Sequence, residues 1–352
     1  MAQAKIDSLT GIRGIAALWV IWFHAMGASS TWYLDNFLRR GYTGVDLFFV
    51  LSGFVISYVY SKKINSFSIE TFKKFIRRRF IRIYPCYLTV LLITLALVLS
   101  VQTFTSIEFT KSSYTPLGFV LQLFMLSGIG LPVDPHQWNS VSWTVSSEFA
   151  AYLVYPIFGF YTHRLKALPS LIGLFSIFAM YFAAAYYVND GKFYFLEEGL
   201  TTTRILSEFT MGCLIYNIFR DEGYRRFFGK MLYPAIILLL ATSFVRAEMI
   251  TGVMVFAFCF ILLGLASNPD SYAAKFLSTP FMKYLGEISY STYLVQSLVL
   301  TAVSRAGDNI NFLGELFQSS VVAYPLFNIV ISCIAGAFFF KYVESYFAKK
   351  FS

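Results

Sequence analysis

Three residues with side chains suited to acid–base chemistry lie in stretches of sequence that are otherwise apolar: His24, Asp46 and Glu148. A titratable side chain in apolar surroundings costs free energy, so each is a candidate for function, with hydrogen bonding between packed helices as the alternative. An imidazole beside a carboxylate can take the proton of a hydroxyl group, because the carboxylate fixes the tautomer of the ring and stabilises the imidazolium. We therefore predict that His24 activates a hydroxyl group, with Asp46 as its partner.

Arginines form a second set of candidate residues. Arg13 and His24 are 11 residues apart, about three helical turns, which places them within roughly 20° of one helix face. Arg79 and Arg82 are i,i+3 neighbours in a basic loop expected between residues 62 and 82, a spacing suited to holding a phosphate by bidentate hydrogen bonds. The alternative to phosphate binding, which explains the basic loop equally well, is the charge bias of cytoplasmic loops together with contact with anionic lipid.

The composition determines which elements must position these residues. Of the 352 residues, 57% are hydrophobic and 13% are charged, whereas soluble domains carry roughly 25% charged residues. The net charge of +9 is better explained by basic loops of a membrane protein than by nucleic-acid binding. The four cysteines occur singly, without the spacing of a metal site, so no metal is expected.

Apolar segments long enough to cross a bilayer recur along the whole chain. The expected segments, each to within several residues, are 10–28, 43–61, 83–101, 117–130, 143–160, 170–188, 201–219, 232–247, 250–267, 286–304 and 320–341. The fourth is too short to cross. The sequence therefore predicts an all-α integral membrane protein of about ten transmembrane helices plus one short or re-entrant segment, in a single domain over residues 1–352 with no fused soluble domain.

The distribution of Lys and Arg predicts the orientation of these helices. If both termini lie in the cytoplasm, the inner segments hold 20 basic residues and the outer loops hold 6. Cytoplasmic loops carry such an excess, so we predict an N-in, C-in topology.

The buried polar residues are expected to converge on one layer of the membrane. At 1.5 Å per residue, His24, Asp46, Glu148 and Arg204 all come out about 20–22 Å from the cytoplasmic side. Four helices would thus bring an imidazole, two carboxylates and a guanidinium to the same depth.

Five segments of the chain resemble the acyltransferase-3 family. They are Arg13-x10-His24, Gly44-Val45-Asp46-Leu47-Phe48-Phe49-Val50-Leu51-Ser52-Gly53-Phe54, Arg79-x-x-Arg82-Ile83-Tyr84-Pro85, Trp143-Thr144-Val145-Ser146-Ser147-Glu148 and Ser289-Tyr290-Ser291-Thr292-Tyr293-Leu294. They occur in the family's order and cover nearly the whole chain. The resemblance implies an acyl-CoA-dependent O-acyltransferase of the bacterial cytoplasmic (inner) membrane, usually an acetyltransferase, that modifies surface glycans, lipid-linked sugars or secreted small molecules.

The resemblance also implies roles for individual residues. His24 would be the catalytic histidine, with Asp46 and Glu148 in the active site. Arg13, Arg79 and Arg82 would bind acetyl-CoA or another acyl-CoA. We assign the hydroxyl acceptor to four further residues: Arg204, Trp143, Tyr293 and Gln296.

Gln296 is a departure from the family, because many members have a histidine at this position. An amide donates and accepts hydrogen bonds but does not titrate near neutrality. We interpret the change as one of acceptor binding, since His24 and its partners are present.

The expected mechanism has the CoA phosphates on Arg79 and Arg82 and the thioester near His24. His24 would act as general base or carry the acyl group itself. The rival interpretation is a transporter or flippase, because intramembrane charged residues also mark transport pathways.

Overall fold

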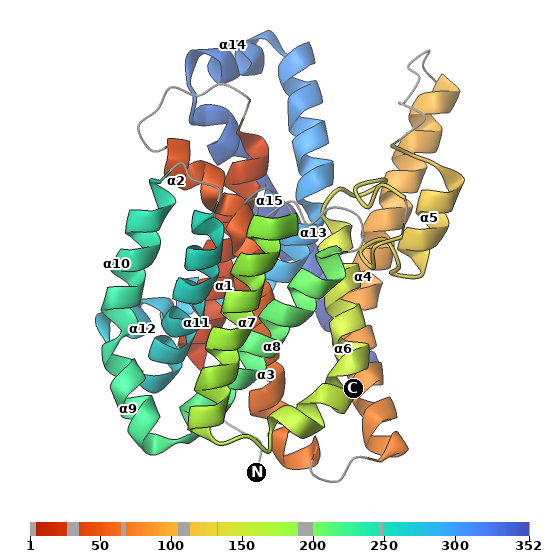
Figure 1. The fold of residues 1–352 in the computed structure, drawn as a ribbon. Coiled ribbons are helices and arrows are strands. Elements are labelled where there is room, and N and C mark those ends of the chain that lie inside the picture. The colour runs from red at the N-terminus through yellow and green to blue at the C-terminus, as the bar shows by residue number, and fades with distance from the viewer. Residues whose placement is uncertain are drawn as a thin grey trace.

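The computed structural model describes residues 5–26, 35–64, 68–104, 113–131, 133–188, 200–245 and 249–351, and in these ranges every regular element is a helix (Figure 1). The elements are α1 (Asp7–Ala25), α2 (Asp35–Arg39), the 3-10 helix η1 (Arg40–Thr43), α3 (Gly44–Ile64), α4 (Ile69–Phe104), α5 (Pro116–Leu123), α6 (Ser142–Thr162), α7 (Ala167–Val188), α8 (Leu200–Arg220), α9 (Glu222–Lys230), α10 (Leu232–Ser243), α11 (Ile250–Ser267), α12 (Tyr272–Leu277), α13 (Pro280–Asn309), α14 (Asn311–Ser319), α15 (Ala323–Phe339), the π-helix η2 (Phe340–Glu344) and α16 (Ser345–Phe351).

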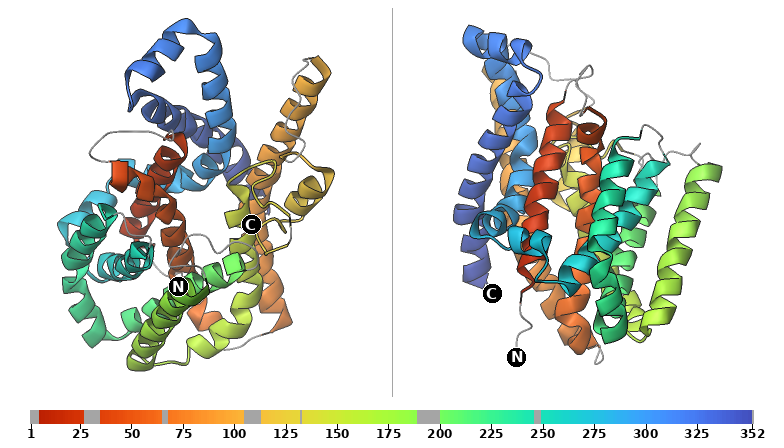
Figure 2. Two further views of the ribbon diagram at one scale, coloured as in Figure 1. Left: turned by 45° about the horizontal axis from the view of Figure 1, so that its top comes forward. Right: turned by 90° about the vertical axis from the view of Figure 1, so that its left-hand side faces the viewer.

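The long helices run side by side and alternate in direction. The end at which α1 begins, at the bottom of Figure 1, is called the lower end here, and the opposite end the upper end. Helices α1, α4 and α13 run upward, whereas α3, α6 and α15 run downward (Figures 1 and 2). The basic first turns of α4, the helix α9 and the end of α16 all lie at the lower end.

The chain is an all-helical membrane protein by length and composition. Within the described ranges, six helices are long and apolar enough to span a bilayer, or seven if α9 and α10, bent by 48°, form one span. The other expected spans lie on α6, α8 and α13, of which α8 and α13 carry several charged residues. The expected short segment contains α5, which has 8 residues.

The basic segment before the third expected span is mostly helical, and the prediction of a loop from 62 to 82 is wrong for residues 62–64, which end α3, and for residues 69–82, which begin α4. Helix α4 begins at Ile69 and continues for 36 residues through Pro85. Lys and Arg are good helix formers, so the basic stretch extends the apolar helix downward. Arg79 and Arg82 therefore lie on a rigid element that continues into the bundle.

Glycines allow two helix pairs to approach closely. A Cβ on Gly53 of α3 would collide with the Phe209 carbonyl oxygen of α8, and a Cβ on Gly286 of α13 would collide with the Thr10 carbonyl oxygen of α1. Small residues have this role in membrane helices, where backbone contact replaces the hydrophobic driving force. The backbones of α1 and α13, and those of α3 and α8, therefore touch at these positions.

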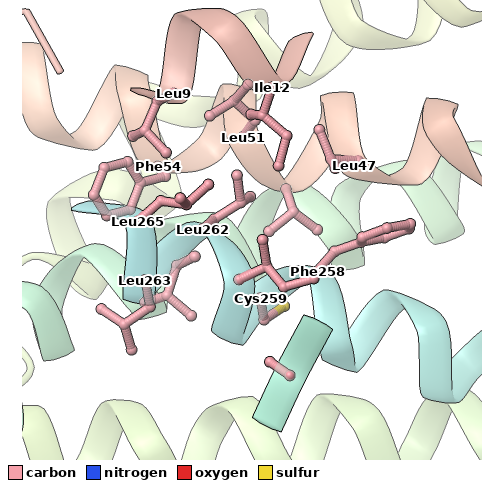
Figure 3. Close-up of a cluster of buried hydrophobic side chains, with 14 of the residues drawn as sticks. Leu9, Ile12, Leu47, Leu51, Phe54, Phe258, Cys259, Leu262, Leu263 and Leu265 are labelled. Atoms are coloured by element: carbon pink, nitrogen blue, oxygen red, sulfur yellow. The ribbon is translucent and has the colours of Figure 1, made fainter. Parts of the chain in front are cut away.

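Apolar side chains fill the space between these pairs and α11. Leu9 and Ile12 of α1 lie with Leu51 of α3 and with Phe258 and Leu262 of α11 in one buried cluster (Figure 3). A second cluster, centred on α3, α4, α6, α8 and α13, includes Phe49, Tyr87, Tyr155, Phe209 and Leu294. The second cluster surrounds the site described next.

Candidate active site

A cavity of about 100 Å³ lies between α1, α3, α4, α6 and α13. Its polar lining comes from residues of all five helices: Arg13, Ser52, Arg79, Arg82, Thr144, Glu148, Tyr152, Ser289, Tyr290 and Tyr293. Five of the ten predicted site residues line it: Arg13, Arg79, Arg82, Glu148 and Tyr293.

Three arginines line this cavity: Arg13, Arg79 and Arg82. The Arg79 guanidinium lies over the rings of Tyr60 and Tyr152, 5.3 and 5.8 Å from their centroids. Its Nε atom is buried without a hydrogen-bond partner, and within the described part of the chain none of the three guanidinium groups forms a hydrogen bond or salt bridge. Arg13 and Arg79 are half-buried and Arg82 is exposed, so three guanidinium groups with free donors line one hollow, an arrangement suited to an anionic ligand.

Glu148 places a carboxylate in the same cavity. It accepts hydrogen bonds from the Ser52 hydroxyl of α3 and from the Tyr152 hydroxyl one turn along α6. These two donors fix the carboxylate opposite the arginines. The sequence predicted Glu148 as part of the site, and the structure brings it together with Arg13, Arg79 and Arg82.

His24 lies in the last turn of α1, at the upper end and outside the cavity lining, with an exposed side chain. Its Nδ1 atom is 2.9 Å from the carbonyl oxygen of Val20, one turn below. A carbonyl oxygen only accepts, so Nδ1 carries the proton and Nε2 has the free lone pair. The ring is thus held in the tautomer that a base or nucleophile at Nε2 requires.

Asp46 is not the partner of His24 in the structure. Its carboxylate pairs instead with Arg204 of α8, whose Nε also donates to Glu208 Oε1 at 3.2 Å. The Tyr181 hydroxyl donates to the same Glu208 oxygen at 3.1 Å. The equal depth of Asp46 and His24 misled the prediction, because depth along a helix does not determine the direction in which a side chain points. The Val20 carbonyl takes the orienting position expected of Asp46.

A family model described as an acyltransferase domain matches residues 6–341. The chain belongs to the acyltransferase-3 family.

Several proteins are similar in sequence to this chain. The acyltransferase MdmB of Streptomyces mycarofaciens is 24% identical over 97% of this chain and 91% of its own length. The O-acetyltransferase OatA of Staphylococcus aureus is 23% identical over 98% of this chain, which spans only 57% of OatA. Protein 2 in the picA locus of Rhizobium radiobacter is 41% identical over 24% of this chain and 40% of its own length. No solved structure matches.

The other predicted residues of this acyltransferase-3 chain lie at different distances from the cavity. Tyr293 lines it, and its hydroxyl is 2.9 Å from Thr144 Oγ1. Trp143 is outside the lining, with its ring 6.1 Å from that of His136. Gln296 is fully buried outside the lining, and neither of its amide atoms has a partner in the described part of the chain. Arg204 forms ion pairs with Asp46 and Glu208.

Two acidic residues of this acyltransferase-3 chain were missed by the sequence analysis. Glu208 follows Arg204 by four residues, a spacing that itself signals an ion pair within one helix. Glu344 ends the π-helical turn η2 and accepts a hydrogen bond from Ser291 at 2.9 Å. It interacts electrostatically with Arg82 and Arg13. A lone acidic residue near the end of the last apolar segment was the available signal, and π-turns often accompany functional sites.

One histidine outside the long helices has a perturbed proton affinity. His163 follows α6 at the lower end, and its Nε2 atom is 2.8 Å from the Tyr155 hydroxyl. Burial, reinforced by the charge of Arg220, lowers the pKa of His163 to about 4. The ring is therefore neutral at physiological pH and acts as part of the packing between α6 and α8.

Proposed function

We propose that this acyltransferase transfers an acetyl group from acetyl-CoA to a hydroxyl group of a surface glycan, a lipid-linked sugar or a secreted small molecule. The observation that carries the proposal is the cavity with three arginines, Arg13, Arg79 and Arg82, that have no hydrogen-bond or salt-bridge partner in the described part of the chain. A nucleotide-bearing thioester brings the phosphates that such a site requires. The printed names of the relatives MdmB and OatA, an acyltransferase and an O-acetyltransferase, support the same class of reaction.

The topology that suits this function is N-in, C-in with ten crossings in the bacterial inner membrane. The arginines of α4 lie toward the lower end, as do α9 and the end of α16 with their basic residues. A cytoplasmic lower end places these charges on the side where acyl-CoA is made and where basic residues accumulate. The acceptor then reaches His24 from the upper, outer side.

His24 is the proposed base. Its Nε2 takes the proton of the acceptor hydroxyl while the oxygen attacks the thioester carbon. An ester C–O bond forms, the C–S bond breaks, and the proton passes to the CoA thiolate. Attack by Nε2 on the thioester, with an acyl-histidine on the way to the ester, is the second route. Glu148 is proposed to face the donor in the cavity, and Asp46 to hold α3 and α8 in place through Arg204.

Transport is the alternative function, because buried ionisable residues such as Asp46, Arg204 and Glu208 also occur along transport pathways. Purified protein in detergent would be incubated with acetyl-CoA labelled in the acetyl group and with extracted surface glycans or small hydroxyl acceptors. An acyltransferase yields labelled acceptor and free CoA thiol. A transporter yields neither, and their absence with every acceptor and donor would contradict the proposal.

A further inference from the structure

Two aromatic side chains close the upper end of the cavity. Helices α3 and α6 run downward and α13 runs upward, so the uppermost lining residues are Val45 and Phe48 on α3, Thr144 on α6 and Tyr293 on α13. Arg79 of α4, by contrast, is near the lower end. The rings of Phe48 and Tyr293 lie edge to face, with centroids 6.2 Å apart and planes at 64°.

Hydrogen bonds hold Tyr293 in this position. Thr144 Oγ1 donates to the Val141 carbonyl oxygen at 2.9 Å. Because the Thr144 hydroxyl donates its hydrogen bond to that carbonyl, it accepts one from the Tyr293 hydroxyl, also at 2.9 Å. The phenol is thereby tied to α6, and its ring supports Phe48 from the opposite side of the cavity.

His24 lies one helical turn above Val20 on α1. Gly44, next to Val45, packs so closely on α1 that an added Cβ would be 2.8 Å from Val20 Cγ2. The top of the cavity is therefore level with Val20, the residue toward which the His24 ring is directed. A thioester that enters from the arginine end must present its carbonyl carbon at this level, beside Phe48 and Tyr293.

We propose that the Phe48 and Tyr293 side chains limit the length of the acyl group that the enzyme transfers, so that short acyl groups are accepted and longer ones are excluded. The inference rests on the proposed acyl-CoA-dependent transfer. The cavity also has to hold the thioester arm that enters past Arg79 and Arg82, so only the space next to the Phe48–Tyr293 contact is left for the acyl group. Each further methylene must displace a ring that is held by the opposite helix.

The test compares kcat/KM for acetyl-, butyryl- and hexanoyl-CoA in the wild-type protein and in Phe48→Ala, Phe48→Leu and Tyr293→Ala. A methylene admitted to or rejected by an apolar pocket changes discrimination by roughly 10- to 200-fold. We expect the wild type to prefer acetyl-CoA. Phe48→Ala should lower the acetyl-to-butyryl ratio by about tenfold or more, and Phe48→Leu should lower it less.

Phe54→Ala is the matched control. Phe54 is on the same helix but packs against Tyr58, Tyr216 and Phe219, away from the cavity. Its loss should reduce stability and leave the acetyl-to-butyryl ratio unchanged. Phe48→Leu is a milder substitution and serves if Phe48→Ala does not fold.

The outcomes separate this inference from the proposed function. Acetyl transfer by the wild type with an unchanged ratio in the folded Phe48 and Tyr293 variants, or equal use of hexanoyl-CoA by the wild type, would overturn the length limit alone. No transfer by the wild type from any acyl-CoA to any acceptor would overturn the proposed function, and the length limit with it.

Discussion

Asp46 and Arg204 form an ion pair between α3 and α8 in which the side chains are 0% and 7% exposed. Arg204 also binds Glu208, which receives a second hydrogen bond from Tyr181. The network links three helices, α3, α7 and α8, beside the Gly53 contact. We therefore expect substitution of these residues to lower the stability of the protein more directly than it lowers the rate of transfer.

Replacing Asp46 with Asn should destabilise the protein by less than the roughly 3–5 kcal/mol that loss of the sole partner of a buried charge costs, because Arg204 keeps its pair with Glu208. Thermal unfolding in detergent, followed by size-exclusion chromatography, measures the effect. Glu70→Gln is the control, since Glu70 pairs with Lys74 in an exposed i,i+4 bridge, and such bridges contribute about 0–1 kcal/mol. A fully stable but inactive Asp46→Asn variant would instead give Asp46 a direct part in catalysis.

His24→Ala should leave the fold intact and reduce acetyl transfer by a factor of roughly 10²–10⁴ or more, since the side chain is exposed and supplies the free Nε2 atom. Transfer of label from acetyl-CoA is the readout, with protein amounts matched after purification. Met26→Ala, at the end of the same helix, is the control. Near-normal transfer by His24→Ala would remove the histidine from the mechanism.

The double variant Arg79→Ala, Arg82→Ala should raise the KM for acetyl-CoA more than it lowers kcat, because phosphate binding is lost while the reacting groups stay in place. The double variant Arg77→Ala, Arg78→Ala is a close control, since both residues are exposed on the same helix and neither lines the cavity. Lys at positions 79 and 82 should restore binding only in part, because it lacks the planar fork of Arg. If both double variants changed KM and kcat to the same extent, all four arginines would serve only to orient the protein in the membrane.

Gln296→Leu should stabilise the protein by about 1–3 kcal/mol, because it removes a fully buried amide whose two polar atoms have no partner in the described part of the chain. Gln122→Leu is the contrasting variant, since the Gln122 amide donates to the carbonyl oxygens of Gln137 and Asn139. We expect it to lower the unfolding temperature. Loss of stability in Gln296→Leu would show that the Gln296 amide is hydrogen-bonded in the membrane.

The stability of the protein should fall between about pH 6.5 and pH 4 through His163. Its pKa is about 4 in the folded protein and about 6.5 in an unfolded chain, so the unfolded state binds the proton first as the pH decreases. The contribution is fully present above about pH 6.5, and about 3 kcal/mol is lost on reaching pH 4. Unfolding curves of the wild type and His163→Gln across this range measure it. If the wild type and His163→Gln lost the same stability between these pH values, His163 would not be the titrating group.

The positions of the helices could be predicted from the sequence, because the length of an apolar segment can be measured without knowing what the segment packs against. The expected spans 10–28, 43–61 and 250–267 coincide closely with α1, α3 and α11. The lower part of α4 was missed because basic residues interrupt the apolar pattern without breaking the helix.

The pairing of side chains could not be predicted in the same way. Asp46 and Arg204 are 158 residues apart, and their contact depends on the rotation of α3 against α8, which the glycine contact fixes and hydropathy does not. Arg13, Arg79, Arg82 and Glu148 were identified by spacing and resemblance, and they meet in one cavity. Glu344 was missed because the π-turn turns it inward at a point where the apolar segment seemed to have ended.

The glycine contacts between α1 and α13 and between α3 and α8 also restrict how the cavity can change shape. Each pair is joined through backbone atoms, so its two helices cannot slide apart without breaking many contacts at once. The cavity lies between the pairs, with Arg13 and Tyr293 on one wall and Ser52 on the other. Any widening of the cavity is therefore expected where the two pairs meet each other and α4 and α6, and not within either pair.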